Sequence, residues 1–587
     1  MANEDVKNIT QDTMHATIAS ALSAANSEDV IAIRKTVTPY QETLGTGVAP
    51  LNFPVTFIGY NSEFTAPVEE IDDYPVLDGT VNGRISVVIT GSTTPVIFNR
   101  LIMQNARSGG AEWWGGSALF SNDSAIQLIK LRVLSCSSEC TNSGIKWGGA
   151  IHINGDTLTF GVDIQDLYGQ DCYSEDWGRG GLLQVNGGGT SRVNLTVDGI
   201  EANNCYSICP DIARWYYGAG AILIQSLVQP RLNNIKGLNC SIRSLYHAAQ
   251  SDEPGWGSVL KIDDVKEYDG EPAVIINNFE ASSPDILVIG ADAMKGWSVL
   301  GLTNIDGVVN LRNCSLTKNN SRNGTGGLGC YVDGNWIAGN NLTVNCYDCI
   351  FRGNTGSKTN VSWPIEPWGG DNGYIETTGG ADLVVNFYNC NVGTDMTAGT
   401  GEPHDWYLAG QTENITMNRV AATCIDVDSS FVDSGDSPLA LTYDSPCVNA
   451  GVGGGLSTDI IGEDRPSPTG GDSDIGAYEY QWVTLPTPTF LPVAGPVEIG
   501  TEVTPQCSED GVTFRYTDDG SDPTGASPIL AGAYTVSAGV DLKVIAEKAG
   551  WTTSEVGSAA YTVIDDSGGI MPMQFTSRAR HNRTRGR

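Results

Sequence analysis

The chain has 587 residues, enough for two to four ordinary domains or for one long repetitive domain with small attachments. Glycine contributes 71 residues and charged residues only 17%, which argues against coiled coils and charged helical bundles. The 40% hydrophobic content excludes wholesale disorder, and the chain has no apolar run of about 18 residues, so we expect no membrane insertion. The composition predicts an all-β, glycine-rich protein.

The net charge of −35 arises from 33 basic and 68 acidic residues, and a field of this sign repels nucleic acid. We therefore expect no nucleic-acid partner. The C-terminus is the exception, because five arginines fall within its last ten residues. We expect residues 565–587 to form a basic tail that is flexible or docked on an acidic partner. These arginines are Arg578, Arg580, Arg583, Arg585 and Arg587.

The N-terminal residues 13–25 read as one short helix, with Ile18, Leu22 and Ala25 on one face, followed by a strand from Val30. The first residues have neither a basic region nor an apolar region, so we expect no secretory signal. A stack of strands exposes the edge of its first strand, which would promote aggregation. We therefore predict that residues 1–27 form a helical cap on that edge.

Tryptophan recurs about every 36 residues through the middle of the chain. Several of these tryptophans precede small residues and a short alternating strand, as in Gly148–Ile153 and Gly218–Ile224. Such a repeat, with period-2 alternation and glycine-rich turns, is typical of a β-solenoid. The positions are Trp114, Trp147, Trp177, Trp215, Trp256, Trp297, Trp336, Trp368 and Trp406.

Cysteine follows the same period, often directly after asparagine. We expect one column of buried, reduced thiols, because a same-position column buries cysteine as a small hydrophobe. The pair Cys346/Cys349 has a two-residue gap but no partner pair at zinc-site spacing, so we predict no metal site. The predicted column contains Cys136, Cys172, Cys205, Cys240, Cys314, Cys346 or Cys349, Cys390 and Cys424.

The repeats end in a characteristic sequence: Ser445–Gly451, then Asp459–Gly462 with Arg465, then Asp474–Tyr480. This sequence resembles the closing signature of right-handed parallel β-helix proteins of the pectate-lyase-like superfamily. The glycine-rich repeat starts and the Asn-Cys positions resemble the same superfamily. The resemblance implies a right-handed parallel β-helix over residues 28–482, and it leaves the activity open because one fold hosts many functions.

A second module follows Pro486. Its alternating strands and Asp-Gly and Asp-Pro turns, in Phe514–Thr524, Leu542–Ala546 and Tyr561–Val563, resemble the small β-sandwich at the C-terminus of chitobiases and related hexosaminidases. The resemblance implies an Ig- or fibronectin-like β-sandwich over residues 486–564. In that family the module is an accessory, so the resemblance does not imply chitin cleavage.

The recurrent tryptophans are the candidate carbohydrate-binding residues. A tryptophan ring serves equally for packing the edge of the solenoid or for stacking on sugar rings. Acidic residues precede several of them, and a carboxylate beside an aromatic face suits glycan hydroxyls. The selected residues are Trp114, Trp147, Trp177, Trp215, Trp256, Trp368 and Trp406.

The catalytic candidates are Glu175, Asp176 and Asp211. Carboxylates at equivalent positions of adjacent coils would lie about 4.8 Å apart, near the roughly 5–5.5 Å of retaining glycosidases. The chain lacks a Gly-His-Gly tripeptide, so it does not follow the polygalacturonase pattern. We expect no cofactor, although a lyase would require a calcium-binding acid cluster. His152 alternates with two isoleucines and is expected on the surface or in a groove.

Three functional hypotheses remain open. The first is a bacteriophage virion surface protein, tailspike-like or decorating the particle, that binds glycans and attaches to other virion proteins through its basic tail; a homotrimer would follow by analogy. The second is a secreted or cell-surface bacterial adhesin. The third is a polysaccharide lyase or glycoside hydrolase, although we consider a non-enzymatic role the better prediction.

Overall fold

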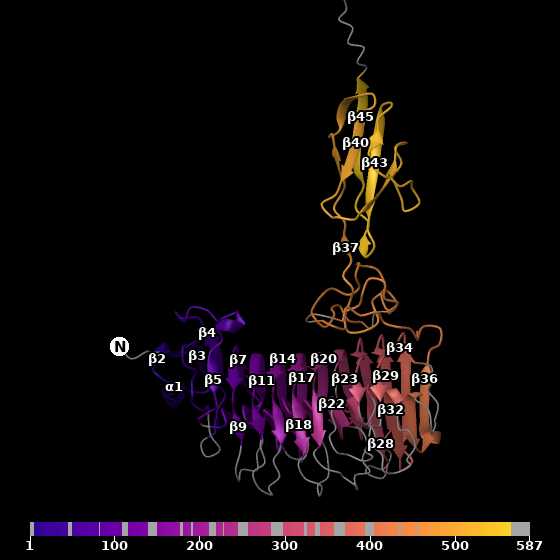
Figure 1. Ribbon diagram of the computed structural model, residues 1–587. Helices are drawn as coiled ribbons and strands as arrows, with labels where there is room; N and C mark the ends of the chain where they lie inside the picture. The colour runs from indigo at the N-terminus through magenta and orange to yellow at the C-terminus, as the bar shows by residue number, and fades with distance from the viewer. Residues whose placement is uncertain are drawn as a thin grey trace, which may run out of the picture. The chain divides into compact units, whose positions relative to one another are not determined.

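A computed structural model gives the arrangement of the chain (Figure 1). The chain consists of two compact units, residues 1–480 and residues 481–587. The residues that the structure describes are 5–44, 50–81, 83–108, 116–138, 149–175, 180–188, 192–209, 219–226, 228–244, 256–282, 297–321, 326–334, 341–356, 370–393, 404–433, 435, 437–452 and 455–564. The basic tail therefore lies outside the described residues.

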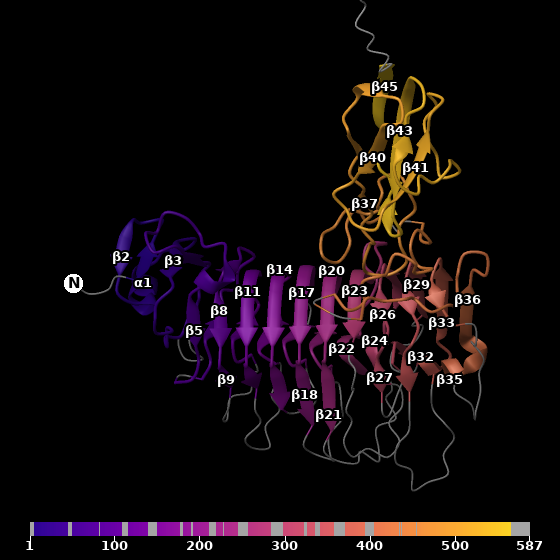
Figure 2. The same cartoon turned by 45° about the horizontal axis from the view of Figure 1, so that its top comes forward.

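The first unit is nearly all β, and its largest sheet, sheet A, has 19 strands. Its long strands lie side by side in Figure 2. Apart from β1 and β2, its strands pair in parallel. The strands are β1 (Val6–Asn8), β2 (Thr13–His15), β3 (Val30–Arg34), β4 (Thr56–Tyr60), β5 (Val76–Asp78), β7 (Val96–Asn99), β8 (Ile102–Gln104), β11 (Ile126–Leu134), β14 (Phe160–Gln170), β17 (Val193–Asn203), β20 (Val228–Leu238), β23 (Val274–Ser282), β25 (Gly307–Arg312), β26 (Ser315–Leu316), β29 (Asn341–Tyr347), β30 (Ile350–Phe351), β33 (Asp382–Tyr388), β34 (Asn391–Val392) and β36 (Ile415–Arg419).

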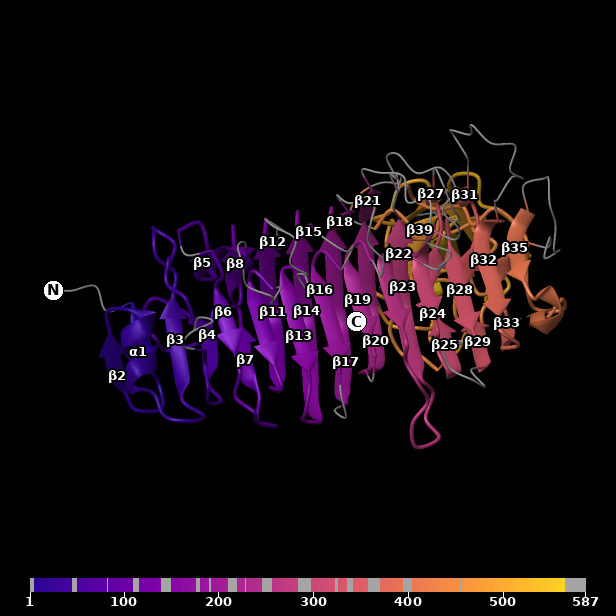
Figure 3. The same cartoon turned by 90° about the horizontal axis from the view of Figure 1, so that it is seen from below.

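Sheet B has ten parallel strands and sheet C has five (Figure 3). Sheet B contains β6 (Ser86–Val88), β10 (Leu119–Asn122), β13 (Ile151–Gly155), β16 (Leu183–Gly187), β19 (Ile222–Gln225), β22 (Trp256–Asp263), β24 (Trp297–Thr303), β28 (Leu328–Asp333), β32 (Gly370–Thr378) and β35 (His404–Gly410). Sheet C contains β9 (Arg107–Ser108), β12 (Ser137–Ser138), β15 (Tyr173–Glu175), β18 (Tyr206–Cys209) and β21 (Ser241–Ser244). Strands β27 (Asn320–Ser321) and β31 (Thr355–Gly356) form a small parallel pair.

The chain visits these sheets in turn, and each visit pairs in parallel with the previous one. Ile151 of β13, for example, stands beside Leu183 of β16, which stands beside Ile222 of β19. Equivalent residues therefore form columns that cross the strands at about 4.8 Å per step. The predicted all-β character and the long parallel sheets are confirmed.

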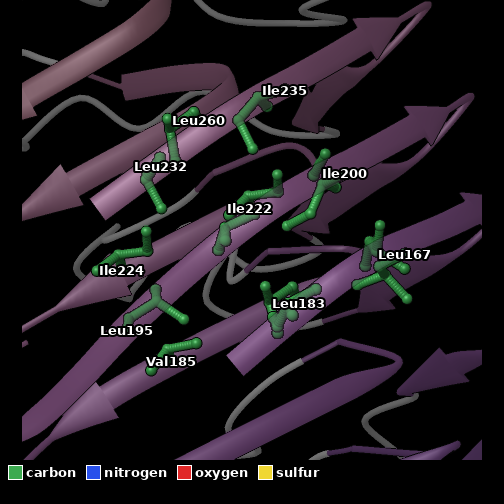
Figure 4. Close-up of a cluster of buried hydrophobic side chains, with 14 of the residues drawn as sticks. Leu167, Leu183, Val185, Leu195, Ile200, Ile222, Ile224, Leu232, Ile235 and Leu260 are labelled. Atoms are coloured by element: carbon green, nitrogen blue, oxygen red, sulfur yellow. The ribbon is translucent and has the colours of Figure 1, made fainter. Parts of the chain in front are cut away.

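The inward columns of the sheets form one continuous hydrophobic core. Figure 4 shows Leu183 and Ile222 of sheet B directed toward Leu195 and Ile200 of sheet A. These side chains are at most 2% exposed. Burial on this scale supplies the main favourable term in folding, at roughly 25 cal/mol per Å² of apolar surface.

Two residues with left-handed backbone bend the repeats that contain β11, β14, β17 and β20. In β14 the first is Asp166 (φ 59°), and the buried alternation shifts by one residue after it. The second, Asp171 (φ 54°), follows the strand and directs the chain into sheet C. Aspartate and asparagine tolerate this conformation better than most residues, which explains the asparagines that precede many cysteines. We call these positions the first and second corners.

The cysteines form two ladders instead of the predicted single column. The first ladder follows the second corner, and its members are Cys136, Cys172, Cys205 and Cys240. The second ladder follows the first corner instead. The register between β23 and the strands β25 and β26 places Cys314 opposite Phe279, which comes directly after the first corner of its repeat. That ladder continues through Cys349, Cys390 and Cys424. All eight are buried free thiols, as predicted.

The glycines that begin several repeats lie where backbones approach closely. A Cβ atom on Gly149 would come within 2.0 Å of the Gly180 carbonyl oxygen, and one on Gly220 within 2.0 Å of the Ser258 carbonyl oxygen. The Gly220 amide donates in turn to the Gly257 carbonyl oxygen at 3.0 Å. Packing therefore requires the Gly-Gly and Gly-Ala starts before β13, β16 and β19.

The N-terminal segment differs from the prediction. Helix α1 spans only Ile18–Ala24, because a capping box between Thr17 and Ser20 starts it there. Residues 13–15 form β2 instead, which pairs antiparallel with β1, and β1 pairs antiparallel with β3. The edge of β3 is thus covered by the pair β1–β2. No helical cap is shown: the predicted helix is shorter than expected, and strands β1 and β2 pair along this edge.

The remaining short helices in the described residues are η1 (Ile71–Asp73) and η2 (Thr412–Asn414). The second unit has its own core around Val503, Leu542 and Tyr561. Its strands form a three-stranded sheet, a four-stranded sheet and one pair. They are β37 (Val483–Thr484), β38 (Thr489–Leu491), β39 (Gly495–Glu498), β40 (Glu502–Gln506), β41 (Thr513–Thr517), β42 (Tyr534–Thr535), β43 (Val540–Glu547), β44 (Trp551–Thr552) and β45 (Gly557–Ile564).

Candidate functional site

Most candidate tryptophans belong to connections that enter sheet B. Trp114, Trp147, Trp177, Trp215 and Trp368 lie outside the described residues, in the segments just before β10, β13, β16, β19 and β32. Trp256 is the first residue of β22, and its register partner is Trp297, the first residue of β24. Because the sheet B strands are parallel, their first residues lie along one edge of the sheet. We call this the entry edge.

Trp406 does not belong to an exposed ridge. It lies in β35, is 0% exposed, and packs against Phe351 and Phe387 with ring centroids 5.8 and 5.0 Å away. Its register partner is Gly373, whose missing side chain leaves room for the indole. The predicted sugar-binding role is therefore wrong for Trp406, which follows the packing alternative.

The structure places one of the three catalytic candidates. Glu175 ends β15, and its partner on the next strand is Ile208. Asp176 and Asp211 themselves lie outside the described residues. Of the catalytic candidates, only Glu175 is placed.

Sheet B carries polar columns on the face away from the core, and the structure buries them. His152, expected on the surface or in a groove, is only 2% exposed, and its ring centroid lies 5.5 Å from that of Phe120. In the same column Gln184 is 0% exposed, and its side-chain amide makes no hydrogen bond within the described residues. Further along, Lys261 Nζ lies 3.9 Å from Asp263 Oδ2. The sequence signal for such residues is a polar side chain alternating with isoleucine.

Glu376 is a second buried carboxylate on this face that the sequence reasoning missed. Its Oε2 accepts the Tyr374 hydroxyl at 2.5 Å, and both residues belong to β32. Gln225 Nε2 similarly donates to Asp263 Oδ2 at 3.2 Å. The face of sheet B away from the core therefore carries acidic side chains whose positions are fixed by hydrogen bonds from neighbouring polar side chains.

The closing sequence packs against the outer face of sheet A through a buried ionic cluster. Arg465 and Glu479 side chains are both 0% exposed, with Arg465 Nε 3.5 Å from Glu479 Oε2. Asp474 Oδ1 accepts a hydrogen bond from the Asn449 backbone N–H at 2.7 Å, and burial raises the pKa of Asp474 to about 7. The Tyr478 hydroxyl donates to Glu280 Oε2 of β23 at 2.5 Å. The closing sequence thus has a structural role. We call the buried contacts of Arg465, Asp474, Tyr478 and Glu479, which include the bond to sheet A, the clasp.

A groove of about 680 Å³ lies between the closing segment and sheet A. Its sheet side is formed by β14, β17, β20 and β23, with Tyr168, Glu201 and Lys236 at successive register positions. Its other side is formed by Gly435, Ser437, Pro438 and Ile461. No sequence motif marked this groove, because it depends on the closing segment folding back onto strands more than 150 residues earlier.

Within the described ranges no three His, Cys, Asp or Glu side chains converge as metal ligands would. No helix among the described residues is long and apolar enough to cross a bilayer.

Residues 492–558 match the family model of the chitobiase/β-hexosaminidase C-terminal domain, a β-sandwich-like module. This match confirms the predicted resemblance of the second unit. The comparisons with curated proteins and with solved structures both found no match. The module match covers only part of the smaller unit, so it assigns no activity to the larger one.

Proposed function

We propose that residues 28–482 form a right-handed parallel β-helix of the pectate-lyase-like type and that the protein binds glycans along the entry edge of sheet B. The proposal is supported by sheets A, B and C, which the chain visits in turn and in parallel register. A match to a module of carbohydrate-active enzymes in the second unit favours a carbohydrate ligand.

One observation carries the glycan proposal. The parallel register of sheet B brings the first residues of its strands to a single edge, and the sequence has a tryptophan shortly before β10, β13, β16, β19 and β32. A polysaccharide also repeats at regular intervals, so a row of aromatic rings can contact successive sugars along one chain. Binding at several weak contacts on one scaffold gains affinity through effective concentration.

Alanine substitution at two entry-edge tryptophans tests this proposal. We expect Trp147→Ala combined with Trp177→Ala to weaken binding to immobilised capsular or smooth lipopolysaccharide preparations by about tenfold, because each lost ring removes apolar contact area. Trp551→Ala in the second unit is the matched control and should bind normally. Unchanged binding by the double variant, with its thermal unfolding unaltered, would contradict the proposal.

The location that we propose is the surface of a bacteriophage particle, where the arginines of residues 578–587 dock on acidic virion proteins and the β-helix assembles as a homotrimer. The basic charge of this tail, opposite to the acidic remainder, supports an electrostatic attachment. Mass spectrometry of purified particles tests the location. Recovery of the chain only from the bacterial envelope fraction would favour the adhesin alternative.

A depolymerase is the second candidate, favoured by the chitobiase/β-hexosaminidase module. Size-exclusion chromatography of the same polysaccharides after incubation with the full chain distinguishes the two. Shortened chains would establish an enzyme, whereas unchanged chain length with retained binding supports a binding protein.

A further inference from the structure

The groove between sheet A and the closing segment is a second surface with the chemistry of a ligand site. Two ionisable side chains in its wall, Glu201 of β17 and Lys236 of β20, occupy register-equivalent positions. Adjacent strands place their backbones about 4.8 Å apart. Neither side chain makes a hydrogen bond or ion pair with the part of the chain that the structure describes, and Lys236 Nζ instead lies 5.6 Å from the Tyr478 ring centroid.

The groove is held in shape by contacts at its margins. The Tyr478 hydroxyl donates to Glu280 Oε2 at 2.5 Å, which ties the closing segment to β23 beside Lys236. Glu280 is 1% exposed, and burial raises its pKa. On the other side, the Arg132 guanidinium lies 5.8 Å from the Tyr168 ring centroid. A ligand therefore meets a preformed wall, which limits the entropy lost on binding.

The wall combines opposite charges with neutral polar groups and apolar patches. A carboxylate and an ammonium group that face one cavity without pairing are each satisfied by a hydroxyl, which donates to the first and accepts from the second. Asn203 and Ser437 add neutral donors and acceptors, while Leu238 and Pro438 offer apolar surface to ring C–H groups. Glu201 and Lys236 cancel in charge, so the pair does not select an anionic ligand.

We propose that this groove binds a neutral pyranose sugar, with two vicinal hydroxyls bridging the Glu201 carboxylate and the Lys236 ammonium group. The site is distinct from the entry edge, and it does not rest on the function proposed there. Its ligand class follows from the unpaired acid and base, from the neutral amide and hydroxyl groups, and from a volume of about 680 Å³, which accommodates one or two sugar rings.

Titration of the full chain with monosaccharides tests the proposal. The probes are methyl α-glucopyranoside, methyl α-galactopyranoside, methyl N-acetyl-β-glucosaminide and galacturonate, followed by saturation-transfer NMR and calorimetry. We expect one neutral glycoside to bind and both Glu201→Ala and Lys236→Met to weaken its Kd by about tenfold, since hydrogen bonds to charged groups are the strong ones. Glu413→Ala and Lys130→Met, which lie outside the groove, are the matched controls.

Three results would overturn this assignment: no binding by any neutral glycoside, binding by galacturonate alone, or an unchanged Kd in both groove variants. Unaltered thermal unfolding of the variants shows that they fold. The combined Trp147→Ala and Trp177→Ala variant separates the two sites, because it should keep monosaccharide binding in the groove. Failure at the entry edge would therefore leave this result intact, and failure here would leave polysaccharide binding intact.

Discussion

At the scale of single residues, packing depends on which side chains share a column. Trp406 fills the core because the preceding strand offers Gly373 at the same position, and a Cβ atom on Gly373 would lie 2.2 Å from the indole Cζ3. The next position back in the column is Leu328, an ordinary core residue. The indole of Trp406 thus occupies the space that a side chain at position 373 of the neighbouring strand would need.

Gly373→Ala should destabilise the larger unit by about 1–3 kcal/mol, because overpacking forces the indole or the backbone to shift. Differential scanning calorimetry measures the loss as a lower melting temperature. Gly161→Ala in β14 is the control, since a Cβ atom there meets nothing within 4 Å. Combining Gly373→Ala with Trp406→Leu should recover part of the loss, and additive effects would argue against the contact.

Asp474 makes the stability of the clasp depend on pH. Burial raises its folded-state pKa to about 7, above the unfolded value of about 3.9. The folded state therefore binds the proton more tightly between these values, and the stabilisation is lost as pH rises through that window. We expect the melting temperature of the larger unit to fall from pH 5 to pH 8, and to fall less in Asp474→Asn. Equal slopes in both proteins would refute this role.

The sequence supplied the types of site residue but not their surroundings. Tryptophan recurrence could not separate Trp406 from the other tryptophans, because the deciding fact is a glycine 33 residues earlier. Spacing alone also could not show that the register partner of Glu175 is Ile208, because equivalence across strands is set by register. The groove at Lys236 required the fold-back of residues 435–461 and left no local pattern.

At the scale of elements, the corners determine how each repeat bends. Asn204 adopts φ 50° just before Cys205, whose thiol donates to the Gly169 carbonyl of the preceding repeat at 3.6 Å. Local sequence predicted the strands well, because alternation is visible within one repeat. Local sequence predicted one cysteine column instead of two. Cys240 follows the second corner and Cys314 follows the first, and only the strand register shows this difference.

The corner conformation gives a direct prediction. Asn204→Val should lower the melting temperature of the larger unit, because a β-branched residue at positive φ costs on the order of 1–2 kcal/mol. Asn204→Gly accepts the same backbone and should cost less, although it also loses the bond to Asp171. If valine and glycine destabilised equally, the lost hydrogen bond and not the backbone would explain the asparagine.

The ladder thiols should resist alkylation in the native protein. Burial raises the pKa of Cys240 to about 12, which suppresses its reactive thiolate form. Peptide mass spectrometry after iodoacetamide treatment should find Cys240 and Cys205 unmodified until urea is added. Cys507, which is partly exposed in the second unit, serves as the labelled control. Modification of Cys240 at the rate of Cys507 would contradict a packed ladder.

At the scale of the whole molecule, the chain consists of two units with separate cores. We expect two calorimetric transitions in the full chain, and Val503→Ala should lower only the one that belongs to residues 481–587, because Val503 is buried in that core. Residues 486–564 expressed alone should reproduce the lower-enthalpy transition. A single transition that moves as one would mean that the units unfold together.

The register of sheet A also makes the chain modular in an evolutionary sense. Val193 stands beside Val228, so the 35 residues from 193 to 227 carry the chain from one position to its equivalent on the next strand. Removing that stretch joins Arg192 to Val228 and leaves every inward column continuous. Gain or loss of such lengths can therefore lengthen or shorten the protein without redesigning its core, as long as a cut and its rejoining fall on register partners.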